Sequence, residues 1–103
     1  MDERNFRIWL EQQKNYHTAR TYASRCMRVE SEMNINLDEE YFLDGGAGLL
    51  EKMKYTRDEQ RQRKKPMCGL KFEENVDVYT GMNSLRASIK KYFEFMHQSK
   101  EKE

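Results

Sequence analysis

The feature that most constrains the fold is a long amphipathic pattern in the last third of the chain. Over residues 74–97, large apolar side chains recur at steps of three and four through five turns. Such spacing places side chains on one stripe of an α-helix, whereas a strand requires strict alternation. The pattern therefore predicts one long helix whose apolar stripe other elements must cover. Its members are Tyr79, Met82, Leu85, Ile89, Tyr92, Phe93 and Met96.

Two shorter amphipathic patterns precede it. Asp2 is a suitable N-cap for a first helix to about Lys14, and a second helix is expected to start at His17 or Thr18, with His17 as its cap, and to reach about Asn34. The apolar residues of the first are Phe6, Trp9 and Leu10, and those of the second are Ala19, Tyr22, Cys26, Val29 and Met33. We expect Trp9, Tyr22, Val29, Leu85, Ile89 and Phe93 to be buried against one another, and aromatic side chains at this spacing to pack in a core rather than stack on bases.

The middle of the chain is less regular. Residues 34–36 break the second helix, and a short helix capped by Asp38 is expected to end at residues 44–46. A further helical segment, residues 49–64, is weakly apolar at its start and polar afterwards, and Pro66 and Gly69 indicate a loop. Residues 1–98 are expected to form one domain, followed by a frayed tail over residues 99–103.

The composition agrees with a helical fold. One proline and five glycines stand among many Glu, Lys, Arg, Gln and Met residues, which favour helices, and Val and Ile are scarce. A length of 103 residues suits a single domain. The predicted class is all-α, a small orthogonal bundle of four to five helices.

The same residues argue against several classes of protein. Two distant cysteines, Cys26 and Cys68, in a chain rich in Lys and Arg indicate reduced thiols and a cytoplasmic protein. No metal is expected, because His17 and His97 do not cluster with the cysteines. No apolar run approaches the ~18 residues of a membrane span. We also expect no cofactor and no small-molecule substrate.

Charge is distributed unevenly. The net charge is only +1, but residues 1–50 carry six basic and nine acidic side chains, and residues 51–103 carry thirteen and nine. Seven of the basic residues fall within residues 52–65, opposed by Asp58 and Glu59. This segment is a local positive patch in a nearly neutral chain.

The basic residues outside the apolar stripes are the candidates for contacts with nucleic-acid phosphates. Long cations on a rigid helix suit such contacts, although a solvated, salt-bridged surface would have the same pattern. Arg57, Arg61, Lys64 and Lys65 follow helical steps of four, three and one, so three or four of them are predicted to share a face. The complete set is Arg20, Arg25, Arg28, Arg57, Arg61, Lys64, Lys65, Arg86, Lys90 and Lys91.

No catalytic arrangement stands out. The acidic cluster of residues 38–44 lacks the alternating ligands of a calcium loop and is better explained as a helix start. Residues 45–48 lack the Lys-Ser/Thr of a phosphate loop and are expected to form a turn. Cys68 has no adjacent histidine to activate it. We therefore expect a binding module that catalyses no reaction.

Three segments together resemble a known family. They are Phe6-Arg-Ile-Trp-Leu10, Thr18-Ala-Arg-Thr-Tyr22 with Arg28-Val-Glu30, and the segment 84–95, in which Leu85-Arg86 precedes the aromatic end Tyr92-Phe93. In type and order they resemble the three matching helices of the N-terminal core-binding domain of tyrosine recombinases, the phage integrases. The resemblance spans about residues 4–97 and rests mostly on core positions, so it bears on fold more than on function. It is loose between residues 38 and 71.

The resemblance implies a SAM-like bundle that grips duplex DNA during recombination of a phage or mobile element. The family's catalytic domain, with its arginines, histidines and nucleophilic tyrosine, has no counterpart here, so a fragment of a recombinase and a free-standing relative both remain open. The alternative is a small mobile-element protein that docks on and regulates or inhibits a protein partner, such as a nucleic-acid enzyme. That function would use the acidic residues 38–44 or exposed Met and Tyr side chains.

Overall fold

The computed structural model describes residues 1–66, 68–73 and 76–101, and all regular structure in these ranges is helical. The predicted all-α class is thereby confirmed. Within the described ranges, six helices follow one another, two of them very short: α1 (Glu3–Glu11), α2 (Tyr16–Met33), α3 (Leu37–Asp44), α4 (Ala47–Lys52), α5 (Arg57–Arg61) and α6 (Val78–Glu101).

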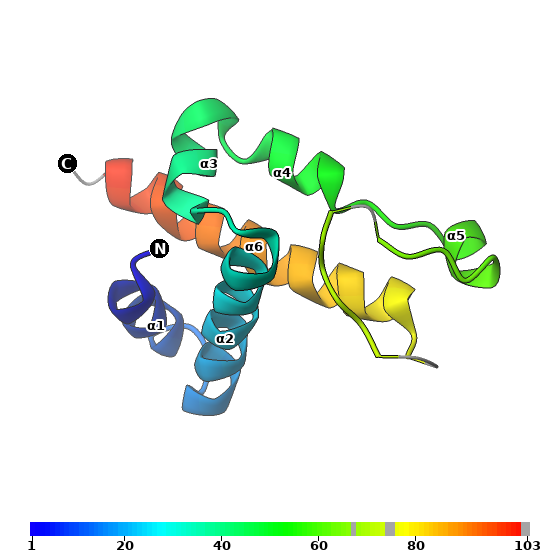
Figure 1. Ribbon diagram of the computed structural model, residues 1–103. Coiled ribbons are helices and arrows are strands. Elements are labelled where there is room, and N and C mark those ends of the chain that lie inside the picture. The colour runs from blue at the N-terminus through cyan, green and yellow to red at the C-terminus, as the bar shows by residue number, and fades with distance from the viewer. Residues whose placement is uncertain (67, 74–75, 102–103) are drawn as a thin grey trace.

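Helix α6 runs through the length of the molecule and the other helices pack around it (Figure 1). α2 crosses it, α1 lies against α2 and the C-terminal half of α6, and α3, α4 and α5 follow one another along another side. Figure 1 places α1 and α5 at opposite ends of the assembly. The predicted stripe on α6 is thus the axis of the core, and its most deeply buried members include Met82, Leu85, Ile89 and Tyr92.

The predicted core is largely present, with two differences. Val29, Leu85, Ile89 and Phe93 are buried, whereas Trp9 and Tyr22 are only partly buried. Trp9 lies at the rim because its indole N–H donates to Gln98 Oε1 at 3.1 Å while its ring stays 5.7 Å from that of Phe95. An indole with a polar atom to satisfy commonly keeps one edge near solvent.

Helix starts were predicted less well than helix faces. Asp2 caps α1 as expected, but Asn15 caps α2 through its side chain, so His17 lies inside the helix and is not the cap. Asn36 caps α3, and the prediction of Asp38 there is wrong. In both cases an Asn two positions earlier supplies the side-chain acceptor for the free backbone N–H groups.

Asp38 instead belongs to a polar cluster that joins three helices. The Tyr92 hydroxyl donates to Asp38 Oδ1 and accepts from the backbone N–H of Asp2 at 2.8 Å. The carboxylate of Glu30 accepts from the backbone N–H of Leu37 at 2.9 Å and pairs with the Met1 ammonium at 3.1 Å. Burial, followed by the Asp38 carboxylate, raises the pKa of Tyr92, which therefore stays protonated as a donor.

The segment 49–64 is not one helix. α4 ends at Lys52, and α5 begins anew after Thr56, whose hydroxyl accepts from the Glu59 N–H while the Glu59 carboxylate accepts from the Thr56 N–H. This reciprocal capping box makes Thr56 a strong helix start. Met53 and Tyr55, in the break, are buried, so the interruption places two large side chains in the core.

The ends of α6 also differ from the expectation. Asp77 accepts from the N–H and hydroxyl of Thr80 at its start, and this lowers the pKa of Asp77. The predicted start at residue 74 lies outside the described residues. The helix continues to Glu101, beyond the Ser99 at which we expected a frayed tail, and residues 102 and 103 also lie outside the described ranges.

Candidate nucleic-acid interface

Within the described ranges, three of the ten candidate cations form ion pairs with carboxylates, and Arg28 is the most firmly held. Arg28 pairs with Glu32 at 2.6 Å, donates to the Lys71 carbonyl and lies 4.9 Å from the centre of the Phe72 ring. Burial opposes ionisation of Glu32, but hydrogen bonds from the Lys71 N–H and from Arg28 outweigh it and lower the Glu32 pKa. Arg28 therefore fastens the loop after α5 to α2.

Lys91 and Arg61 are engaged in a different way. Lys91 pairs with Glu94 at 3.2 Å and lies 5.5 Å from the centre of the Trp9 ring, and Arg61 pairs with Asp58 at 3.2 Å. These pairs are exposed enough to exchange readily for another anion. The ion pairs make Lys91 and Arg61 weaker candidates for phosphate contacts but do not exclude them.

α5 is fixed against the start of α6. Gln60 Oε1 accepts from the backbone N–H of Tyr79 at 3.1 Å, and the Arg57 guanidinium lies 4.8 Å from the centre of the Tyr79 ring. Hydrogen bonds from Asn83 and Arg57 lower the pKa of Tyr79. Arg57 thus stays at the surface but is held over an aromatic face.

The predicted shared face of Arg57, Arg61, Lys64 and Lys65 does not form. α5 ends at Arg61, and Lys64 and Lys65 lie on the loop that follows. The Arg63 N–H donates to the Gln60 carbonyl and the Lys64 N–H to the Glu59 carbonyl, which is the Schellman arrangement. Arg63 occupies its left-handed position with φ of 54°.

The loop cations gather at one cavity of about 950 Å³ between α5, the following loop and the start of α6. Within the described ranges, Arg63, Lys64 and Lys65 are exposed and make no ion pair with a carboxylate. Lys71 adds a fourth cation, against the acidic Glu73 and Asp77. The rest of the lining is mostly apolar or neutral: Tyr55, Gln60, Pro66, Gly69, Leu70, Phe72, Val76 and Val78.

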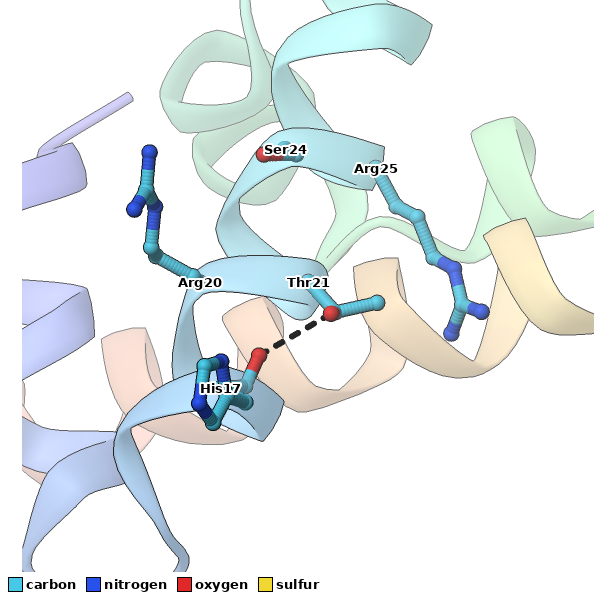
Figure 2. Close-up of a pocket in the computed structure, with 5 residues that line it drawn as sticks. All are labelled: His17, Arg20, Thr21, Ser24 and Arg25. Atoms are coloured by element: carbon cyan, nitrogen blue, oxygen red, sulfur yellow. Dashed lines mark hydrogen bonds between the residues drawn. The ribbon is translucent and has the colours of Figure 1, made fainter.

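A shallow pocket on α2 holds two more candidates. Figure 2 shows Arg20 and Arg25 leaving the helix in different directions, with His17, Thr21 and Ser24 between them. Arg20 contacts the Tyr16 ring at 5.8 Å, and Thr21 donates its hydroxyl to the His17 carbonyl at 2.9 Å, so that proton is used within the helix. The two guanidinium groups do not converge on one point.

Arg86 and Lys90 come from the middle of α6. Lys90 is exposed, whereas Arg86 is partly buried and its Nε has no hydrogen-bond partner among the described residues. The ten predicted residues are therefore spread over α2, α5, the loop and α6, and only Lys64 and Lys65 line the larger cavity.

Two contributors were missed in the sequence. Arg63 and Lys71 line the cavity, and neither is among the ten predicted residues. The signal that would have found Arg63 is the unbroken run Arg63-Lys64-Lys65 directly before Pro66, which is typical of a loop.

Other site types have little support in the described residues. Over residues 1–66, 68–73 and 76–101, no three His, Cys, Asp or Glu side chains group as metal ligands. In the same ranges no helix is both long and apolar enough to cross a membrane. Burial, with Glu30 adding to it, raises the pKa of the Cys26 thiol to about 12, which keeps it protonated and unreactive.

Comparison with known proteins gives no family. No protein-family model, no curated protein and no solved structure matches the chain.

Proposed function

We propose that this protein binds the phosphate backbone of duplex DNA without catalysing a reaction, and that residues 63–65 with Lys71 make the principal contacts. The observation that carries the proposal is the gathering of these four cations around one cavity, three of them exposed and without carboxylate partners in the described ranges. Arg and Lys are among the side chains that bond to phosphate oxygens, and a braced backbone holds them in position for such contacts. The Schellman motif braces Arg63, and the contacts of Arg28 with Glu32 and Lys71 brace the far side of the loop.

The predicted affinity is modest. A net charge of +1 gives no attraction over the whole molecule, so binding depends on the local patch. Backbone contacts of this kind have Kd values of about 10⁻⁴–10⁻⁶ M and weaken steeply with salt. The resemblance to an integrase core-binding domain adds the reason for choosing duplex DNA as the ligand.

The test compares two double variants with the same change of net charge. Lys64→Glu/Lys65→Glu should flatten the slope of log affinity against log salt concentration by about 0.9 for each phosphate that the protein no longer neutralises. Arg4→Glu/Lys14→Glu reverses two exposed cations of the α1 region, at the other end of the molecule, and should leave the slope nearly unchanged. Fluorescence anisotropy with a labelled duplex at 20–300 mM salt measures both.

Two results would contradict the proposal. One is an absence of binding by the wild type at the lowest salt concentration. The other is an equal reduction of affinity in both double variants, which would indicate a general charge effect. Circular dichroism and melting curves establish that each variant is folded.

A second candidate function is docking on a protein partner, and the exposure of α3 favours it. Leu43 is 79 % exposed and Phe42 61 %, the two highest values among the large apolar side chains that the structure describes. Acidic side chains surround them on the same short helix. Charge reversal on α3 should abolish capture of such a partner and leave DNA binding equal or slightly stronger, since carboxylates repel phosphate.

A further inference from the structure

Two surfaces of the molecule are opposite in charge and both partly apolar. The first is the α3 ridge, which we define as the exposed Glu39, Phe42, Leu43 and Asp44 with the partly buried Glu40. Its helix contains no basic residue. Two large apolar side chains thus project between carboxylates on the outside of the bundle.

The second surface is the cavity beside α5, which we call the basic groove. Apolar atoms of Leu70, Phe72, Val76 and Val78 contribute to its lining, and Val76 is itself 39 % exposed. Arg63, Lys64, Lys65 and Lys71 supply four positive charges against the negative Glu73 and Asp77. The basic groove is therefore a partly apolar cavity whose charged lining residues carry a net positive charge.

The two surfaces cannot meet within one molecule. The Tyr41 ring, on α3, lies 5.9 Å from the Phe93 ring of α6, while Gln60, on α5, accepts from the backbone N–H of Tyr79 of the same helix. Positions 79 and 93 are about 20 Å apart along α6 at 1.5 Å per residue. Figure 1 likewise shows α3 near the C-terminal half of α6 and α5 beside its first turns.

We infer that the α3 ridge of one copy docks in the basic groove of a second copy of this chain. Leu43 and Phe42 would enter the apolar part of the groove, and Glu39, Glu40 and Asp44 would face the cations on its border. Opposite potentials steer the encounter and fix the register, and burial of the apolar side chains supplies the attraction at short range. A two-fold pair would form this contact twice, and a one-sided contact would repeat from copy to copy.

Docking of the α3 ridge does not depend on DNA binding, but both would use the basic groove. Duplex DNA and the α3 ridge are both anionic and would compete for Arg63, Lys64 and Lys65. Self-association should therefore decrease when DNA is added. A chain that binds DNA and stays monomeric would refute the docking alone, and one that associates without binding DNA would refute only the proposed function.

The test uses charge reversal on each surface of the full chain, followed by mixing. Sedimentation equilibrium at protein concentrations from 10 µM to 1 mM, at low salt, should show an average mass that rises with concentration for the wild type. Glu39→Lys/Glu40→Lys makes the ridge basic and Lys64→Glu/Lys65→Glu makes the groove border acidic. Each variant alone should associate at least about tenfold more weakly, because like charges then face each other.

Mixing the two variants is the decisive step. The reversed ridge then meets the reversed groove, and the unchanged groove of one variant meets the unchanged ridge of the other, so association should return to near the wild-type level. Glu11→Lys/Glu94→Lys, with the same change of net charge as the ridge variant at exposed positions elsewhere, should associate like the wild type.

Three results would overturn the inference: a wild type that stays monomeric at 1 mM, ridge and groove variants that associate as the wild type does, or a mixture no stronger than its components. If a reversed variant fails to fold, Leu43→Ser provides the second measurement. Leu43 is too exposed for the fold to need it, so this variant should stay folded and associate at least about fivefold more weakly. Undiminished association of Leu43→Ser would also overturn the inference.

Discussion

The two regions packed against α6 differ sharply in how they are held. Residues 1–37 contribute seven buried apolar side chains, from Phe6 to Leu37, all of them at most 2 % exposed. The described residues between 47 and 77 contribute four, and α5 contributes none. The first region is fixed by apolar burial. In the second, hydrogen bonds that Gln60 and Glu32 accept and that Arg28 donates add to a smaller set of buried side chains.

This difference separates stability from recognition. Regions with few buried contacts open at a lower free energy than the global unfolding, and ligand-contacting segments are often drawn from them. The four cations proposed to make the principal contacts with DNA all lie in the second region, so substitutions there should change binding much more than folding.

Leu85→Ala should destabilise the protein by about 2–4 kcal/mol, because it removes a buried side chain and leaves a cavity that the surrounding core fills only in part. Leu70→Ala should cost less than about 2 kcal/mol, since Leu70 borders an existing cavity and leaves little new empty volume. Urea unfolding followed by circular dichroism measures both. Equal destabilisation by the two variants would show that the two regions are equally well packed.

Tyr92→Phe should cost about 1–3 kcal/mol, although it keeps the ring, because it leaves the Asp2 N–H and the Asp38 carboxylate without their hydroxyl partner. The matched control is Tyr22→Phe, compared with it by urea unfolding. Tyr22 is partly buried and its hydroxyl makes no hydrogen bond within the described residues, so this change should be nearly neutral. An equally mild Tyr92→Phe would mean that the polar cluster contributes little.

Much of the secondary structure of the first region could be predicted from the sequence, because its helices carry apolar residues that recur at helical spacing. The stripes of α2 and α6 recur over several turns, and such redundancy tolerates an error at any one position. Caps depend on a single side chain, and several Asn, Asp and Thr residues compete near each start. The caps of α2 and α3 are therefore Asn15 and Asn36, where His17 and Asp38 were predicted.

The second region was harder to predict, since its order comes from long-range contacts. The break after α4 places Met53 and Tyr55 in the core, and the local spacing of apolar residues does not predict this. Thr56 and Glu59, however, do form a recognisable capping box. Arg28 was predicted to face DNA, but Glu32, Lys71 and Phe72 surround it. A cation's partners 43 positions away cannot be inferred from one sequence.

Glu32 makes the attachment of the second region dependent on pH. Its pKa is lower in the folded protein than its ordinary value of 4.5, so the stability it contributes is fully present above pH 4.5 and is lost as the pH falls through the lowered value. Glu32→Gln should cost at most about 1 kcal/mol at pH 7, because the pair with Arg28 is partly exposed. Below pH 4.5 the curves of variant and wild type should converge, as denaturant titrations across pH 3–7 will measure. A difference in unfolding free energy between variant and wild type that stays constant from pH 3 to pH 7 would exclude this role of Glu32.

The smallest predicted effect on folding is also the one that separates stability from binding most clearly. At the C-terminal ends of helices, three described residues have positive φ: Asn34 after α2 and Gly45 after α3, which suit that conformation, and Arg63 after α5, at 54°, which does not. Arg63→Gly should therefore raise the free energy of unfolding by up to about 1 kcal/mol, because the relief of strain is partly offset by the greater freedom of glycine in the unfolded chain.

If Arg63 contacts phosphate, the same variant should flatten the slope of log affinity against log salt by about 0.9. Arg63→Ala removes the charge and keeps the strain, so it should flatten the slope equally without the gain in stability. Urea unfolding and anisotropy on the two variants would then show binding and folding moving in opposite directions at one residue. A glycine variant that binds DNA with the wild-type slope would remove Arg63 from the interface.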